Sequence, residues 1–269
     1  MKDSREKRIL LHVDQQGIAV LQVNRPRARN ALDWLAQEQF AATIAQIAED
    51  EQIRILIVTG SGERAFVSGG DLKQLSDDPH QAAGERLNRV MTAALTQLTL
   101  LPLPVIAAVN GDAFGGGCEI ITACDLRLAA AHARFSFAQV RNALTTGWGG
   151  TGRLVRLLGQ SRALELLLTA RVFDATEALS FGFVHRVIPE DEAVLDAART
   201  LAQELVALPG EALAATKAVT YAACQLDADD LLQYERRLFL DLWATPDHLE
   251  ALAAFREKRA PQFNRRRLP

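Results

Sequence analysis

Two glycine-bearing segments of the chain carry residue types that suit acyl chemistry. Residues 65–72 read Ala-Phe-Val-Ser-Gly-Gly-Asp-Leu, and residues 110–119 read Asn-Gly-Asp-Ala-Phe-Gly-Gly-Gly-Cys-Glu. Glycine lets a ligand approach free backbone N–H groups closely. Two such groups converging from two loops form an oxyanion hole for a carbonyl oxygen that gains charge. Either segment alone is more typical of a tight turn, so the prediction of a site depends on both.

A third glycine-rich segment, residues 147–152, formally matches the G-x-G-x-x-G pattern of dinucleotide sites. Asp174 even lies near the offset expected of a ribose-binding acid. However, the preceding residues 142–146 are mixed and partly polar, and the segment lies in the middle of the chain. We therefore predict no dinucleotide site here.

The elements that must position these segments alternate between strands and helices. Residues 17–23 alternate as a strand does, and the apolar runs 53–59 and 105–109 are typical of buried parallel strands. Apolar residues at helical spacing begin after Asp33, a plausible N-cap, and predict a first helix. Residues 76–101 predict a second helix. We predict an α/β fold, with the first two glycine segments directly after the strands at 53–59 and 105–109, where open sheets bind ligands.

The hydrophobic pattern of the chain changes near residue 189. Four consecutive stretches have helical periodicity with no strand between them: 190–208, 210–224, 228–244 and 246–259. We predict two parts: a core over residues 1–188 that holds the site, and a helical region over residues 189–269.

Composition excludes several classes of protein. With 49% hydrophobic and 23% charged residues among 269, the chain is not largely disordered. A formal net charge of −3 argues against general nucleic-acid binding. The first eight residues carry charges of both signs, and no apolar stretch is long enough to span a bilayer, so we expect a cytoplasmic protein without membrane contact. The common zinc signatures are absent from the sequence.

The order of the segments resembles the crotonase (enoyl-CoA hydratase/isomerase) superfamily over about residues 9–263. The matching motifs are Asn-Arg-Pro…Asn-Ala-Leu at 24–32, the two glycine segments, and the stretches 135–154 and 255–263. Each motif is weak alone, but together and in order they are highly specific.

That resemblance implies a ββα spiral with a C-terminal helical region that forms homotrimers or hexamers (dimers of trimers). It also implies a coenzyme A thioester as the ligand, with no metal and no cofactor beyond the CoA of the substrate. Gly70 and Gly116 match the oxyanion donors, and Glu119 matches one of two catalytic glutamates. Positions that match the family's CoA-binding residues are Arg27, Ala28, Ser68, Asp71, Leu72 and Lys73, with Phe255 and Lys258 reaching a neighbouring subunit's CoA.

The chain departs from the family pattern at Gln139, where the second catalytic glutamate is expected. Glutamine hydrogen-bonds and orients water but exchanges no proton. The favoured reading is a hydratase-like lyase with Glu119 as sole carboxylate and Gln139 orienting water or substrate. The alternatives are a decarboxylase of malonyl-type CoA thioesters, a double-bond isomerase, or a non-catalytic acyl-CoA-binding protein. The acyl group stays open.

Overall fold

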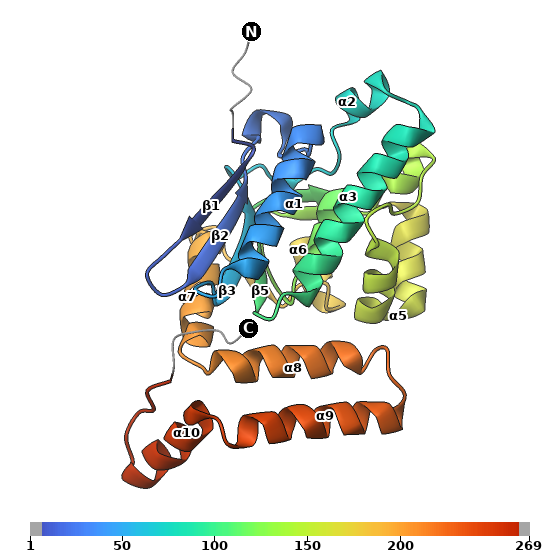
Figure 1. Cartoon of the computed structure of the whole chain (residues 1–269). Coiled ribbons are helices and arrows are strands. Elements are labelled where there is room, and N and C mark those ends of the chain that lie inside the picture. Colours follow the sequence, from blue (N-terminus) through green and yellow to red (C-terminus); the bar gives the residue numbers. More distant parts are fainter. Residues whose placement is uncertain (1–6, 264–269) are drawn as a thin grey trace.

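The computed structural model describes residues 7–263, which fold around a six-stranded sheet of order β1-β2-β3-β5-β7-β10 (Figure 1). β1 pairs antiparallel with β2, and the other neighbours are parallel. The strands are β1 (Ile9–Val13), β2 (Ile18–Val23), β3 (Ile55–Gly60), β5 (Val105–Val109), β7 (Leu126–Ala130) and β10 (Arg186–Ile188). The strands expected at 17–23, 53–59 and 105–109 are thereby confirmed, as is the α/β class.

Both faces of this sheet are apolar, which explains why its strands read as continuous hydrophobic runs. Within β3, Leu56 and Val58 join the core under α1 (Trp34–Glu49) and α3 (Gln81–Leu100), while Ile55 and Ile57 join the core under α7 (Val194–Val206). The sheet is therefore sandwiched between helices (Figure 1).

The predicted helix over residues 76–101 is wrong at its start. The chain forms α2 (Leu72–Asp77), breaks, and begins α3 at Gln81. Pro79 lies in the break, where it lacks an N–H donor and disfavours helical backbone at Asp78. The Asp33 cap of α1 is confirmed, because its carboxylate accepts the Ala36 N–H at 2.8 Å.

A second sheet, of order β4-β6-β8-β9, was not predicted from the sequence. It contains β4 (Ala65–Val67), β6 (Asp112–Phe114), β8 (Arg134–Ser136) and β9 (Phe173–Asp174), and β4, β6 and β8 are parallel. The second glycine segment starts directly after β5, as expected, whereas residues 61–64 separate the first segment from β3. Each segment also contains a strand that was not expected, β4 or β6, because three residues are too few to show a period.

The C-terminal helices divide into one that packs on the sheet and three that leave it. α7 belongs to the sheet core, whereas α8 (Gly210–Ala222), α9 (Ala228–Trp243) and α10 (Pro246–Glu257) extend away from it (Figure 1). Lys217 joins α8 to the core through an ion pair of 2.7 Å with Asp125. The division at residue 189 stays a prediction.

Residues 1–6 and 264–269 lie outside the described range, and the expected cytoplasmic location stays a prediction. Across residues 7–263, no helix combines the length and apolarity that a membrane crossing requires.

Candidate active site

Three neighbouring parallel strands of the small sheet end at one pocket of about 360 Å³. Gly70 follows β4, Gly116 follows β6, and Gln139 follows β8, and all three line the pocket. Because parallel strands present their carboxyl ends at the same edge, segments that are 46 and 23 residues apart in sequence meet there. The small sheet is what positions the site.

The N–H groups of Gly70 and Gly116 are two free backbone donors of the pocket. Neither has an acceptor in the described part of the chain. Each follows a glycine with positive φ, +99° at Gly69 and +53° at Gly115, a conformation that other residues rarely adopt. A Cβ built on Gly69 would lie 3.2 Å from the Gly116 nitrogen, so the two loops are in contact. This arrangement suits a single carbonyl oxygen.

Glu119 lies in α4 (Gly116–Ile121), and its buried carboxylate is surrounded by N–H donors. One oxygen, Oε2, accepts the backbone N–H groups of Trp148 and Gly150, both at 2.8 Å. The other, Oε1, accepts the Gln139 side-chain amide at 2.8 Å and the Gly147 N–H at 3.3 Å. Because the contact from the Gly147 N–H is long, Oε1 is better able than Oε2 to accept a hydrogen bond from a further donor.

Burial raises the pKa of Glu119 above the ordinary glutamate value. The hydrogen bonds from Gly150, Trp148, Gln139 and Gly147 favour the charged form and oppose part of this rise. The carboxyl group is thus moved toward the range in which it can both accept and return a proton near neutral pH.

The glycine-rich segment 147–152 has a role that the sequence did not indicate. Its N–H groups hold the Glu119 carboxylate, so the match to a dinucleotide pattern reflects a carboxylate cradle. The buried Trp148 ring covers Gly116, since a Cβ on Gly116 would lie 2.1 Å from Cζ3 of that ring. Trp148 also lines the pocket. The conspicuous glycine spacing beside a tryptophan was the only signal for this cradle.

The fit between Gly150 and Glu119 makes a substitution test. A Cβ on Gly150 would lie 2.5 Å from Cγ and 2.7 Å from Oε2 of Glu119. We expect Gly150→Ala to destabilise the fold by about 1–3 kcal/mol and, by displacing the carboxylate, to lower the catalytic activity of the site roughly 100-fold. Thermal unfolding and steady-state kinetics measure both effects.

Gly152 is the matched control, because a Cβ there meets nothing within 4 Å and it lies in the same helix, α5 (Gly150–Thr169). Gly152→Ala should leave activity unchanged and add up to about 1 kcal/mol of stability. Equal behaviour of the two variants would contradict the cradle.

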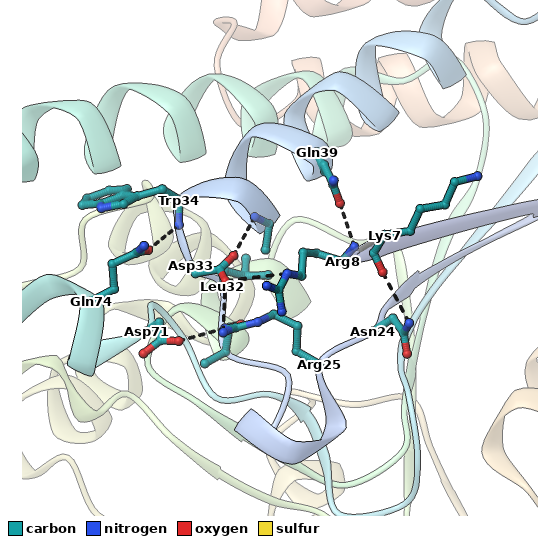
Figure 2. Close-up of polar contacts among 12 residues, drawn as sticks. Lys7, Arg8, Asn24, Arg25, Leu32, Asp33, Trp34, Gln39, Asp71 and Gln74 are labelled. Atoms are coloured by element: carbon teal, nitrogen blue, oxygen red, sulfur yellow. Dashed lines mark hydrogen bonds and ion pairs between the residues drawn. The ribbon is translucent and has the colours of Figure 1, made fainter. Parts of the chain in front are cut away.

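Asp71 is engaged in structure rather than facing the pocket. The Arg25 guanidinium lies between the carboxylates of Asp33, at 3.0 Å, and Asp71, at 2.9 Å (Figure 2). Burial disfavours the charged form of Asp71, but the Arg25 guanidinium and the backbone N–H groups of Gln74 and Lys73 together outweigh it, and the pKa falls below its ordinary value. Nearby, Gln74 accepts the Trp34 N–H at 2.6 Å. This cluster fixes the loop before α1 against the loop that carries Gly70.

The other predicted binding positions divide by location. Ser68 and Leu72 line the pocket, as Glu119 and Gln139 do. The rest of the predicted set forms no part of its wall in the described chain: Arg27 and Ala28 in the short helix Pro26–Ala28, Lys73 in α2, Phe255 in α10 and Lys258 just after it. Their assignment to CoA stays a prediction.

Comparisons with known proteins agree with this geometry. The enoyl-CoA hydratase/isomerase family profile matches residues 13–266. The short-chain-enoyl-CoA hydratase of Clostridium acetobutylicum is 37% identical over 242 residues, which cover 90% of this chain and 92% of that protein. The crotonyl-CoA hydratase of Syntrophomonas wolfei is 36% identical over 255 residues, covering 93% and 95%.

Solved structures of enoyl-CoA hydratases are also similar to this chain. The crystal structure of an enoyl-CoA hydratase from Bacillus anthracis superposes with a TM-score of 0.91 at 33% identity, covering 96% of this chain and 99% of that one. An enoyl-CoA hydratase from Mycobacterium smegmatis superposes with a TM-score of 0.90 at 32% identity, covering 96% and 99%.

Proposed function

The chain belongs to the enoyl-CoA hydratase/isomerase family, and from that premise we propose that it is a lyase that adds water across the double bond of a short enoyl-CoA thioester. The observation that carries the proposal is the meeting of two free N–H groups, Gly70 and Gly116, with the cradled Glu119 carboxylate in one pocket. The names of the relatives from Clostridium and Syntrophomonas support hydration of a short chain.

The proposed mechanism begins with the thioester oxygen bound by the Gly70 and Gly116 N–H groups. Water adds to Cβ as Glu119 accepts one of its protons, and the double-bond electrons move onto the thioester oxygen to give an enolate. The two N–H groups stabilise that charge most strongly once it has formed. Glu119 then returns the proton to Cα, so the product has gained H and OH. Gln139 orients Glu119 and moves no proton.

A second candidate, decarboxylation of a malonyl-type CoA thioester, is favoured by Gln139 itself. Loss of carbon dioxide from such a thioester produces the same enolate and uses the same two N–H groups. It requires a proton donor at Cα afterwards but no pair of carboxylates to activate water. Isomerisation and simple acyl-CoA binding are the remaining alternatives.

A paired assay on the purified protein separates these candidates. Hydration of crotonyl-CoA is followed by loss of enoyl absorbance, and decarboxylation of methylmalonyl-CoA by mass spectrometry. We expect hydration. Decarboxylation without hydration would establish the second candidate, and binding of thioesters without turnover would indicate a non-catalytic member.

The exposed apolar side chains of α9 and α10 support the proposal of a homotrimer or a hexamer. The largest of them are Leu232, Phe239, Leu240, Trp243, Leu249 and Phe255. The rings of Phe239 and Trp243 lie 5.3 Å apart, and exposed apolar side chains that lie together are typical of a protein interface. We expect analytical ultracentrifugation to find a mass of three or six chains and Trp243→Glu to lower it. A monomeric wild-type protein would contradict this proposal. A cytoplasmic location and independence from added cofactors stay predictions.

A further inference from the structure

Arg141 is a positively charged side chain on the pocket wall with nothing to neutralise it. It has no hydrogen-bond or ion-pair partner among residues 7–263, and the same is true of the Asn142 side chain beside it. Both residues line the pocket. Among residues 7–263, the only other charged side chain on that wall is Glu119, whose carboxylate already accepts four N–H groups. The pocket wall therefore carries a solvent-exposed cation without an ion-pair partner and a shielded anion.

Gln139 and Arg141 share one short helix, η2 (Ala138–Asn142), which follows β8. At Gln139 the expected carboxylate is replaced by a neutral amide, and Arg141 lies two residues later. The Gln139 Oε1 is buried and has no hydrogen-bond partner in the described chain. With glutamine at 139, this part of the pocket wall carries the positive charge of Arg141 and no carboxylate of its own.

The remaining wall of the pocket is largely apolar. Leu75, Leu87, Leu144 and Val172 supply apolar surface, and Trp148 occupies the space beside Gly116. At about 360 Å³ the pocket is near the small end of the range for ligand pockets. A free cation at the wall of a small apolar pocket suits a short chain that ends in an anion.

We propose that the acyl group taken by this pocket ends in a carboxylate, bound by the Arg141 guanidinium with Asn142 as a second donor. The substrate class is then a CoA thioester of a short dicarboxylic acid. The inference deepens the proposed function and rests on it for the thioester. Guanidinium binds carboxylate through paired N–H···O contacts, which gives direction as well as charge. A phosphate of CoA is the other anion that Arg141 could meet, and the test separates the two.

Binding of two saturated, unreactive thioesters tests the proposal without any turnover. Glutaryl-CoA has a terminal carboxylate, whereas butyryl-CoA has the same CoA and none. Isothermal titration of the wild-type protein should show glutaryl-CoA binding about tenfold more tightly. Arg141→Gln should weaken glutaryl-CoA about tenfold and abolish that preference. The matched control is Arg186→Gln on β10, an exposed arginine outside the pocket wall, which should keep the preference.

Each result decides the question. Equal weakening of both thioesters by Arg141→Gln would assign Arg141 to a CoA phosphate and overturn the proposal, as would a wild-type protein with no preference. Failure of the proposed function has a different signature, because crotonyl-CoA would then bind without being hydrated while the glutaryl-CoA preference and its loss in Arg141→Gln were retained.

Discussion

Glu119→Gln is expected to lower kcat for hydration of crotonyl-CoA by about two to four orders of magnitude, the usual contribution of a positioned acid or base. The substitution removes the only group in the proposed mechanism that accepts a proton from water. It leaves the Gly70 and Gly116 N–H groups untouched, so thioester binding should survive. Rate measurements under saturating substrate, together with titration of butyryl-CoA, separate lost chemistry from lost binding.

The surroundings of Glu119 can accommodate the neutral amide without collapse. The new amide oxygen still accepts the N–H groups of Trp148 and Gly150, now at Oε2. The new NH₂ group faces Gln139, whose own amide can rotate by half a turn and accept through the Oε1 atom that otherwise lacks a partner. Only the long contact from Gly147 is lost. Glu119→Gln should therefore unfold within a few degrees of wild type.

Glu119→Ala is the contrasting variant. It leaves three backbone N–H groups and the Gln139 amide without an acceptor beside a new cavity. We expect it to lose several kcal/mol of stability, since each orphaned buried donor costs about 1–3 kcal/mol. A fully active Glu119→Gln would remove Glu119 from the chemistry and leave it a purely structural residue.

Gln139→Glu is expected to raise kcat for hydration of crotonyl-CoA by about tenfold or more, in the direction of the 10²–10⁴-fold that a positioned acid contributes. The new carboxyl group would lie where the amide nitrogen now lies, 2.8 Å from Glu119 Oε1. Two carboxyl groups at that distance share one proton, so the pair carries one acid and one base. This restores the second proton-exchanging group that the family pattern contains.

The dependence of kcat/KM on pH tests whether Gln139→Glu adds an acid to the pair. In the wild-type protein, Glu119 must be ionised to accept a proton, so kcat/KM should fall with acidification, at a pH above the ordinary glutamate pKa because burial raises the pKa of Glu119. In Gln139→Glu the shared proton is required, so activity should also fall as pH rises through the upper pKa of the pair. A Gln139→Glu variant with unchanged rate and an unchanged profile would mean that Gln139 is not a lost acid.

The long elements of the fold were predictable because their periods are visible. β5 is an uninterrupted apolar run, β2 and β3 are apolar apart from Gln22, Thr59 and Gly60, and α1 begins at the Asp33 cap as expected. The small sheet was not predictable from periodicity, because strands such as β4 and β6 contain three residues each. Their pairing is a non-local property of the chain. The break before α3 does have a local signal in the sequence, which is Pro79.

The sequence motifs predicted which residues meet at the site. Gly70, Gly116, Glu119 and Gln139 do meet at one pocket, although their catalytic roles stay predictions. The contact of Trp148 with Gly116 could not be derived from the sequence, since it depends on how the chain after β8 returns over α4. The same holds for the ion pair between Asp71 and Arg25, 46 positions earlier, while the CoA contact of Asp71 stays a prediction.

The pocket uses backbone groups for one proposed task and side chains for another, and this affects how its reaction can change by mutation. The groups proposed to bear the enolate charge are main-chain amides held by the small sheet, and most point mutations leave a peptide N–H in place. The groups that would decide the fate of the enolate are side chains on η2, at Gln139 and Arg141. Substitutions at these two positions of η2 would therefore change which product forms from the enolate, while the main-chain N–H groups that stabilise the enolate stay in place.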